Sequence, residues 1–428
     1  HGVWRAGGIA IPLNVASAES EWEHCLTSAG VTQVIADEQT FGSIEGLCER
    51  LSIPIATVSG TLTDSVSSFP ELSPARRAMV VFTSGTTSKP KGAVTTHGNI
   101  AAQIETLITA WEWHADDVIP LFLPLHHVHG IINVLSCALW AGATVYAMPK
   151  LDLTALCAQV AADTFSVFMA VPTIYVKLID HLENLEDEEV EGICEGFANM
   201  RLNVSGSAAC PVEVFEEWRD LTGQMLLERY GMTEIGMALS NPYRGERRPG
   251  YVGQALPDVA VRLVDEEGGI VTGEDAPGEI QIQSPTVFLE YWGNAEATET
   301  SFSDEWFCTG DIAVIEDGYY RIMGRSSVDI IKSGGYKLSA LEIENTLLAH
   351  PQIAEVAVVG IADRTWGEAV AAVVALKGDD DMTLEDLKGW CDGKLSSYKV
   401  PKQLRVVDAL PRNAMGKVVK PSLKPLFE

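Results

Sequence analysis

The order of hydrophobic and polar positions divides the chain into two parts. Up to about residue 325, short runs rich in β-branched residues alternate with amphipathic stretches. Such runs include Thr144–Met148, Phe165–Ala170 and Leu202–Ser205. This alternation predicts an α/β fold of stacked layers, in which helices cover sheets that contain parallel strands.

Between about residues 250 and 323, the apolar and polar pattern typical of helices becomes weak. The segments Val259–Val264 and Gly278–Gln283 alternate apolar and polar residues and are separated by turn-forming sequence. This pattern predicts a β-rich subdomain at the end of the first part.

A compact module follows Asp329. Its predicted elements are a helix at Ala340–His350, strands near Ile353–Ile361 and Ala369–Leu376, and a helix at Leu384–Leu395. The chain has 428 residues, more than one hydrophobic core usually holds. We therefore predict a large domain over residues 1–328 and a small α+β domain over residues 329–428.

The start of the chain reads like the middle of a helix-to-strand unit. It begins at His1 without a methionine, so we expect an N-terminal segment to precede it, and a targeting peptide would not be visible. No apolar run is long enough to span a bilayer, which predicts no integral membrane association.

Net charge and cysteine content narrow the class of protein. The formal net charge is −29, which argues against nucleic acid or an anionic membrane as a partner. The eight cysteines are scattered without a C-x-x-C pair, a pattern that favours a reducing compartment over a disulfide framework or a zinc site. Because the net negative charge of the protein repels anions, a site for an anionic ligand needs cationic side chains close by.

The most informative chemical segment is Thr83–Gly92, which directly follows the apolar run Met79–Phe82. Its hydroxyls, ammonium groups and glycine-freed main-chain N–H groups can turn towards one polyanion. The usual P-loop is excluded, because Pro90 separates the two lysines and would break the following helix. A surface turn is the alternative, since the same residue types dominate turns.

Further blocks follow in a characteristic order. They are Tyr230-Gly-Met-Thr-Glu234, Thr309-Gly-Asp311, Gly324-Arg325 with Gly334-Gly-Tyr-Lys337, and Asn413-Ala-Met-Gly-Lys417. With the loop, they resemble the adenylate-forming superfamily, which contains acyl-CoA synthetases, luciferases and the adenylation domains of peptide synthetases. The blocks span residues 83 to 417, so the resemblance covers most of the chain.

The resemblance implies that the loop cradles the phosphates of ATP. The implied phosphate-binding residues are Thr83, Ser84, Gly85, Thr86, Thr87, Ser88, Lys89, Pro90 and Lys91. Thr86 and Glu234 would hold Mg²⁺, and a hydroxyl with a carboxylate suits this hard ion. Taken alone, Glu234 would read as a capping residue or a surface acid.

The resemblance also implies a site for the nucleoside. The implied residues are Gly206, Ser207 and Ala208 beside adenine, Tyr230, Gly231, Met232 and Thr233 around the base, and Asp311 with Arg325 at the ribose hydroxyls. A turn aspartate such as Asp311 is usually structural when it stands alone.

The last block implies that the small C-terminal domain moves during the reaction. Lys417 resembles the family's mobile lysine, which contacts the α-phosphate and the substrate carboxylate. The small domain would then rotate so that Gly334 and Gly335 line the path of CoA, and Asp329 is our candidate hinge. By itself, a lysine in a glycine loop is nearly always exposed surface.

Three histidines lie in the segment Leu121–Gly130. Consecutive residues point in different directions, and no fourth ligand cluster exists elsewhere, which argues against a metal site. The resemblance instead implies that His127 gates the acyl pocket. Together with Lys417, Glu234 and Thr86, it completes the candidate catalytic residues.

The acyl substrate is predicted from two arginines. Within the superfamily, the segments Leu121–Gly130, Arg201–Ala208 and Leu227–Ser240 are similar to malonyl-CoA synthetases of the eukaryotic, often mitochondrial, branch. This resemblance implies that Arg201, Ser205 and Arg247 contact the acyl group, because guanidinium pairs bidentately with a second carboxylate. A surface ion pair is the alternative for both arginines.

The implied function is an ATP-dependent ligation of malonate or methylmalonate to CoA through an acyl-adenylate, with release of AMP and pyrophosphate. ATP, Mg²⁺ and CoA would be required, the role would lie in fatty acid and lipid metabolism, and the compartment would be the mitochondrial matrix or the cytoplasm. Three alternatives stay open: a medium-chain or aromatic acyl-CoA synthetase, an adenylation module that loads a carrier protein, and a binding protein without catalysis.

Overall fold

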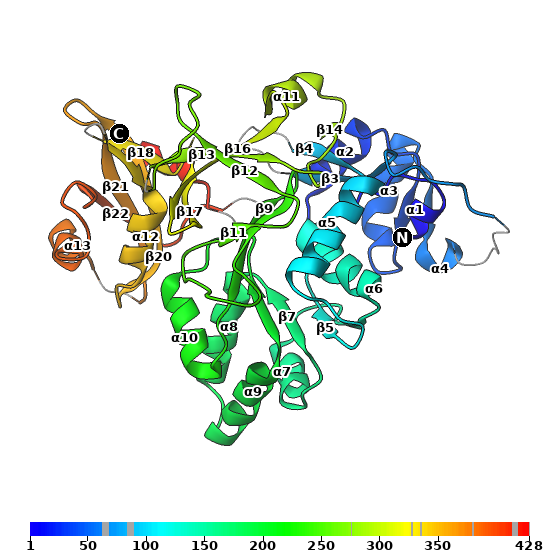
Figure 1. Ribbon diagram of the computed structural model, residues 1–428, viewed down its shortest axis with the longest axis horizontal. Coiled ribbons are helices and arrows are strands. Elements are labelled where there is room, and N and C mark those ends of the chain that lie inside the picture. Colours follow the sequence, from blue (N-terminus) through cyan, green and yellow to red (C-terminus); the bar gives the residue numbers. More distant parts are fainter. Residues whose placement is uncertain are drawn as a thin grey trace.

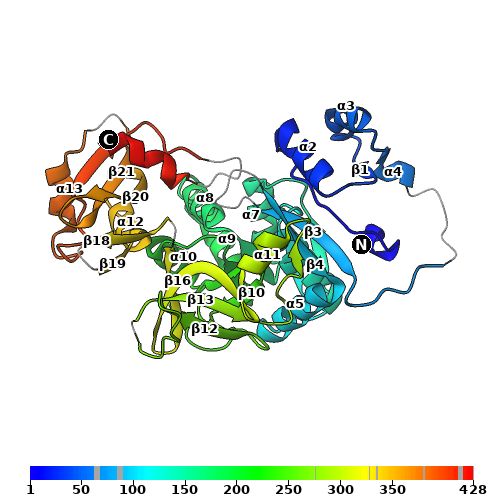
Figure 2. The ribbon, with the colours of Figure 1, turned by 90° about the horizontal axis from the view of Figure 1, so that it is seen from above.

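The computed structural model describes residues 1–61, 68–83, 90–274, 276–326, 328–333, 336–378, 381–412 and 418–427. Figure 1 shows an extended body in which the N-terminal unit lies at one end and the C-terminal unit lies at the other. The view from above in Figure 2 shows the same order of units.

The N-terminal unit consists of short elements around a small core. Helices α1 (Gly2–Arg5), α2 (Glu19–Ser28), α3 (Phe41–Leu51) and α4 (Val58–Thr61) accompany the parallel strands β1 (Val34–Ala36) and β2 (Ile55–Thr57). Leu26, Ile44 and Leu47 are buried together in this core.

The next layers lead into the central sheet. Strands β3 (Arg77–Thr83) and β4 (Lys91–Thr96) are antiparallel, and β14 (Glu290–Tyr291) extends them beside β4. Helix α5 (His97–Ala110) begins at a capping box formed by Thr96 and Asn99. Strands β5 (Val118–Leu121) and β6 (Thr144–Ala147) are parallel. Between them lie the π-helix η1 (His129–Ser136) and α6 (Cys137–Ala141).

The central sheet has the order β11–β10–β9–β8–β7. Strands β7 (Val167–Ala170), β8 (Leu202–Ser205) and β9 (Leu227–Met232) are parallel, as the sequence pattern predicts. Strand β10 (Gly236–Ser240) is antiparallel to β9, and β11 (Gln254–Ala255) is antiparallel to β10, so the sheet is mixed. Helices α8 (Pro172–Leu182), α9 (Asp187–Asn199) and α10 (Val212–Thr222) lie together beneath it in Figure 1, near α7 (Leu153–Ala161).

The predicted β-rich segment is present. It contains β12 (Ala260–Val264), β13 (Gly278–Gln283), β15 (Phe302–Ser303), β16 (Trp306–Glu316) and β17 (Tyr319–Arg325), with the short helix α11 (Ala295–Thr300) between β14 and β15. The neighbouring strands of this sheet are antiparallel.

The C-terminal unit is a sheet that is covered on both faces. Its strands are β18 (Ile330–Ser333), β19 (Tyr336–Ser339), β20 (Ile353–Asp363), β21 (Gly367–Leu376) and β22 (Gln403–Val406). Along β21, Val370 and Ala372 belong to one core and Ala371 and Val373 to the other, as expected from the strand period of two. Helices α12 (Ala340–Leu348) and α13 (Leu384–Cys391) supply the first core, and the 3₁₀-helix η2 (Lys420–Phe427) supplies the second.

The structure confirms the predicted fold class, a mixed α/β protein with a large N-terminal and a small C-terminal part. The main buried core runs from Ala78 to Ala313, and the cores of the small part run from Ile331 to Leu423. The boundary between residues 328 and 329, and the mobility of the small part, stay predictions. Within the described residues, no helix is both long and apolar enough to cross a bilayer.

Candidate functional site

Part of the predicted site lies outside the described residues. These positions are Ser84, Gly85, Thr86, Thr87, Ser88 and Lys89 of the phosphate loop, Gly334 and Gly335 of the CoA path, and Lys417. The two ends of the loop are described. Thr83 and Lys91 are partners across β3 and β4, and the Thr83 hydroxyl donates to the Lys91 carbonyl at 3.4 Å.

A buried carboxylate lies at the base of this loop. Glu234 is 4% exposed, and its Oε1 accepts hydrogen bonds from the Tyr291 hydroxyl at 2.9 Å and from the Thr83 hydroxyl at 3.5 Å. Burial and the charge of Glu234 raise the pKa of Tyr291, so its phenol stays a donor. The Lys91 ammonium lies 4.8 Å from the centre of the Tyr291 ring. Thr83 therefore contacts Glu234, and Lys91 lies against the ring of Tyr291, a partner of Glu234, while the roles of these residues in binding phosphate and Mg²⁺ stay predictions.

The surroundings of Glu234 fit a magnesium ion that is held mainly by phosphate. No cluster of three or more metal-binding side chains occurs among the described residues. Mg²⁺ commonly takes one or two protein carboxylates and fills its octahedron with water and phosphate oxygens. Glu234 can supply that carboxylate, and its predicted partner Thr86 lies outside the described residues.

The predicted ribose residues form one hydrogen-bonded group. Asp311 is 7% exposed; its Oδ2 accepts from the Tyr230 hydroxyl at 2.6 Å and its Oδ1 from Arg325 Nε at 3.0 Å. Burial and the charge of Asp311 raise the pKa of Tyr230. Burial alone would lower the pKa of Arg325, but Asp311 raises it. A carboxylate offers about four lone-pair sites, so Asp311 can still accept two hydroxyl donors.

The predicted adenine wall follows β8 directly. Gly206, Ser207 and Ala208 continue from fully buried Ser205, and Ser207 has a φ of +70°. Gly231 lies on β9, followed by Met232, with Thr233 in the turn before Glu234. A Cβ on Gly231 would lie 2.1 Å from the Gly236 carbonyl oxygen, so the contact between β9 and β10 requires glycine there.

His127 lies at the entrance to the π-helix. Its main-chain N–H donates to the Pro124 carbonyl, and its ring centre lies 4.2 Å from that of His126. Burial and then the charge of His127 lower the pKa of His126 to about 4. Contact of His127 with substrate stays a prediction.

Arg201 pairs with a carboxylate of the protein itself. Its Nε and Nη2 donate to both oxygens of Asp117 at 2.7 and 2.6 Å, and its Nη1 donates to the Trp111 carbonyl at 2.9 Å. Asp117 is 2% exposed and also accepts from Ser166. The guanidinium fork thus holds a buried carboxylate in place of the surface ion pair considered as the alternative, and contact of Arg201 with substrate stays a prediction.

The Arg247 guanidinium also has partners within the protein. They are main-chain carbonyls, whereas the alternative considered from the sequence was an ion pair with a carboxylate. Its side chain donates to the carbonyls of Met225, Pro242 and Tyr243 at 2.6, 3.2 and 2.9 Å. Burial lowers the pKa of this guanidinium. These contacts give Arg247 a structural role in the loop after β10, and its contact with substrate stays a prediction.

Two buried residues of the site were missed in the sequence. Tyr291 is separated from Glu234 by 57 positions and stands in an apolar segment that carries no signal for the contact. Arg229 precedes Tyr230, and its guanidinium packs against Gly206. The sequence gives no sign that Arg229 is buried, because its neighbours are the charged Glu228 and the aromatic Tyr230.

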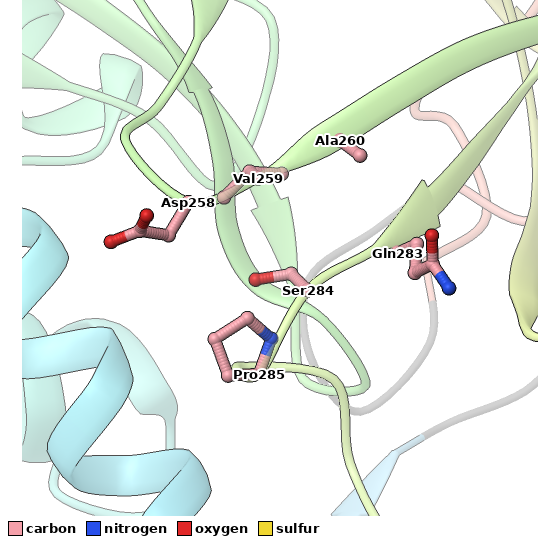
Figure 3. A pocket seen from close by; sticks show the side chains of 6 residues that line it. All are labelled: Asp258, Val259, Ala260, Gln283, Ser284 and Pro285. Atoms are coloured by element: carbon pink, nitrogen blue, oxygen red, sulfur yellow. The ribbon is translucent and has the colours of Figure 1, made fainter.

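A surface pocket of about 470 Å³ lies apart from these residues. Figure 3 shows it between the start of β12 and the end of β13, where Asp258, Val259, Ala260, Gln283, Ser284 and Pro285 line it. It shares no residue with the predicted site.

Comparison with known proteins decides the family. The model of the AMP-binding enzyme family matches residues 1–292, and that of the AMP-binding enzyme C-terminal domain matches residues 342–417. The chain belongs to the AMP-binding enzyme family. This result confirms the superfamily that the motifs indicated.

Similar curated proteins include malonate–CoA ligases. The mouse protein named malonate–CoA ligase ACSF3, mitochondrial, is 44% identical over 98% of this chain and 78% of its own length. Its human counterpart is 41% identical over 98% of this chain and 79% of its own length. The Arabidopsis thaliana malonate–CoA ligase is 40% identical over 100% of this chain and 75% of its own length.

Solved structures of similar proteins also match this chain over most of its length. ATP-bound MatB from Rhodopseudomonas palustris matches with a TM-score of 0.88 and 33% identity, over 99% of this chain and 85% of that one. A malonyl-CoA ligase in a ternary product complex with methylmalonyl-CoA and AMP matches with a TM-score of 0.67 and 35% identity, over 96% and 87%.

Proposed function

We propose that this AMP-binding enzyme is a malonate–CoA ligase. A carboxylate oxygen of malonate attacks the α-phosphorus of ATP, and pyrophosphate leaves. The CoA sulfur then attacks the acyl carbon of malonyl-AMP, its proton is lost, and AMP leaves with the carboxylate oxygen. The observation that carries this proposal is the 41–44% identity to curated malonate–CoA ligases over 98% of the chain.

The described residues support roles for the nucleotide site. Asp311, held by Tyr230 and Arg325, accepts the ribose hydroxyls. Lys91 and Thr83 lie where the phosphates enter the loop, next to Glu234. When bound, Mg²⁺ neutralises phosphate charge as pyrophosphate departs. Glu234 would hold the ion with Thr86, and Lys417 would contact the α-phosphate.

A change of domain orientation between the two half-reactions is part of the proposal. The TM-score is 0.88 against ATP-bound MatB and 0.67 against the product complex, although the identities are 33% and 35%. A rotated small domain would produce such a difference at equal sequence similarity. We propose that Asp329 is the hinge and that Gly334 and Gly335 line the CoA path after rotation.

The compartment is proposed from the relatives. The mouse and human proteins carry "mitochondrial" in their names, and we propose the mitochondrial matrix, with the cytoplasm as the alternative. Imaging the full-length gene product in cells of its own organism tests this assignment.

The function is tested by incubating the protein with ATP, Mg²⁺, CoA and one carboxylate at a time. Malonate, methylmalonate, acetate, octanoate and amino acids form the panel, and products are identified by mass spectrometry. We expect malonyl-CoA, AMP and pyrophosphate in equal amounts, with weaker use of the monocarboxylates. Preferred use of octanoate would indicate a medium-chain synthetase, and an adenylate that is not transferred to CoA would indicate a carrier-loading module.

A further inference from the structure

His24 connects the N-terminal unit to the end of the phosphate loop. It lies on α2, and its Nε2 is 2.9 Å from the carbonyl oxygen of Pro90, 66 positions later in the chain. Because a carbonyl oxygen only accepts, Nε2 carries the proton and donates. The imidazole is half-buried, and it meets the Phe82 ring edge to face with 6.0 Å between the ring centres.

The helix α2 fixes the direction of this side chain. Trp22 and Leu26 are about one turn apart, and both pack against the core of the N-terminal unit. A residue two positions away from each of them points about 200° away around the helix axis, so His24 projects from the opposite side of α2. A helix that is anchored to its own core therefore carries the imidazole to the loop.

Three donors hold the exit of the phosphate loop, which we define as Pro90–Gly92. In chain order, its carbonyls accept from His24 on α2, from the Thr83 hydroxyl at the end of β3 at 3.4 Å, and from the Trp292 main-chain N–H after β14 at 2.7 Å. These donors come from three separate parts of the chain. Together they fix the main chain from which the Lys91 ammonium extends.

Packing also restricts the loop exit. A Cβ on Gly92 would lie 2.7 Å from Val80 Cγ1 and 3.3 Å from Phe82 Cζ, so this position requires glycine. The Phe82 ring thus packs near both the loop exit and the imidazole of His24. Trp292 donates through its main chain, and Thr83 belongs to β3. His24 is therefore the donor that a substitution can remove without a change within the sheet.

We propose that His24 is a positioning residue for ATP, because its hydrogen bond to the Pro90 carbonyl holds the loop exit, and with it Lys91, beside the β- and γ-phosphates. The proposal rests on the ATP-dependent ligase function given above. A loop loses conformational entropy when it closes around a ligand, and fixing one end beforehand reduces this cost. Since His24 acts through the loop, it should matter only for ligands that carry the phosphates held there.

The first experiment compares the Kd for ATP with the Kd for AMP. Both are measured by isothermal titration calorimetry with Mg²⁺ and without carboxylate or CoA. AMP shares the adenosine and the α-phosphate with ATP but lacks the β- and γ-phosphates. His24→Phe keeps an aromatic ring and removes the donor. We expect it to raise the Kd for ATP by about 3- to 10-fold and to leave the Kd for AMP within about twofold.

Two further variants separate the hydrogen bond from a general loss of structure. His24→Gln returns an N–H donor without the ring and should bind ATP more tightly than His24→Phe. Thr27→Val is the control on the same helix, because the exposed Thr27 hydroxyl donates to the carbonyls of Glu23 and His24 within α2. It should leave both dissociation constants unchanged. Equal weakening of ATP and AMP in His24→Phe, no weakening of either, or a His24→Gln variant that binds ATP no better than His24→Phe overturns the proposal.

A measurement on the unmodified protein does not depend on the folding of any variant. Because coupling between two sites is reciprocal, a ligand that fixes the loop should also stabilise α2. Hydrogen exchange of the α2 amides should therefore be slower with saturating ATP and Mg²⁺ than with saturating AMP and Mg²⁺. Equal exchange overturns the proposal. If ATP has this selective effect but malonate is not converted to malonyl-CoA, the ligase function fails and the role of His24 stands.

Discussion

Asp311 and Arg325 face each other as partners across β16 and β17, with 3.0 Å between Oδ1 and Nε. The main-chain N–H of the same arginine donates to the Asp329 carboxylate at 3.0 Å. Arg325 is therefore the point at which the predicted ribose site meets the predicted hinge.

Replacing Asp311 with Asn should weaken ATP binding selectively. Hydrogen bonds to a charged group contribute about 1.5–3 kcal/mol, so we expect the KM for ATP to rise by about 10- to 100-fold. The preference for malonate over 3-methylbutanoate, in which an uncharged isopropyl group replaces the second carboxylate, should not change. Glu316→Gln is the control, because Glu316 pairs with Arg321 on the same two strands and should leave the KM for ATP unaffected. An unchanged KM in Asp311→Asn would remove Asp311 from the ribose site.

Lys420 should be essential for the stability of the small part. Its ammonium lies 2.5 Å from Asp329 and 2.7 Å from Glu344, and all three side chains are largely buried. Lys420→Met would leave two buried carboxylates without a cation, which typically costs about 3–5 kcal/mol. Hydrogen exchange of the amides of β20 and β21 measures this loss. Lys424→Met, which removes a more exposed pair with Glu368 at 3.9 Å, should have little effect.

Arg201→Leu should destabilise the large part without altering substrate choice. The substitution leaves Asp117 buried with Ser166 and a main-chain N–H as its remaining donors. We expect a clear fall in the thermal midpoint, while the malonate to 3-methylbutanoate ratio of the remaining folded enzyme stays within a few-fold. A large change in that ratio would support the substrate contact predicted from the sequence.

Glu228 should give the stability a measurable pH dependence. Burial raises the pKa of its carboxyl to about 7, although the N–H groups of Gly250 and Cys210 oppose the shift. The folded protein then holds a proton that the unfolded chain releases at lower pH. The stability contributed by this proton is complete below the unfolded pKa and is lost as the pH rises towards 7.

Urea unfolding at pH 6 and pH 8 tests this linkage. Between these two values, the unmodified protein should lose about 1 kcal/mol more of its free energy of unfolding than Glu228→Gln does. Parallel losses in the two proteins would show that Glu228 titrates normally.

The sequence predicted secondary-structure elements better than the partners of charged side chains. β-Branched runs placed β8 and β13 at their observed bounds, and the segments with Asp311 and Arg325 became paired strands. Local patterns carry this information because a strand depends on its own alternation of side chains. The partner of a charged residue depends on the tertiary fold.

The arginines illustrate this limit. Arg201 lies 84 positions from Asp117, and nothing local in the sequence connects them. From the sequence, Arg201, Arg229 and Arg247 are all cations in or near the motif segments of the predicted site. Their partners in the fold distinguish them. Arg201 forms an ion pair, Arg229 is a buried cation, and Arg247 contacts main-chain carbonyls of a loop.

The most direct test of the central claim follows oxygen from the substrate into AMP. Malonate labelled with ¹⁸O in its carboxylates is incubated with the protein, ATP, Mg²⁺ and CoA, and the AMP formed is analysed by mass spectrometry. If malonyl-AMP is the intermediate, the attacking oxygen stays on the α-phosphorus, and each AMP carries one ¹⁸O. Unlabelled AMP, or the formation of ADP and phosphate in its place, would contradict an acyl-adenylate mechanism for this chain.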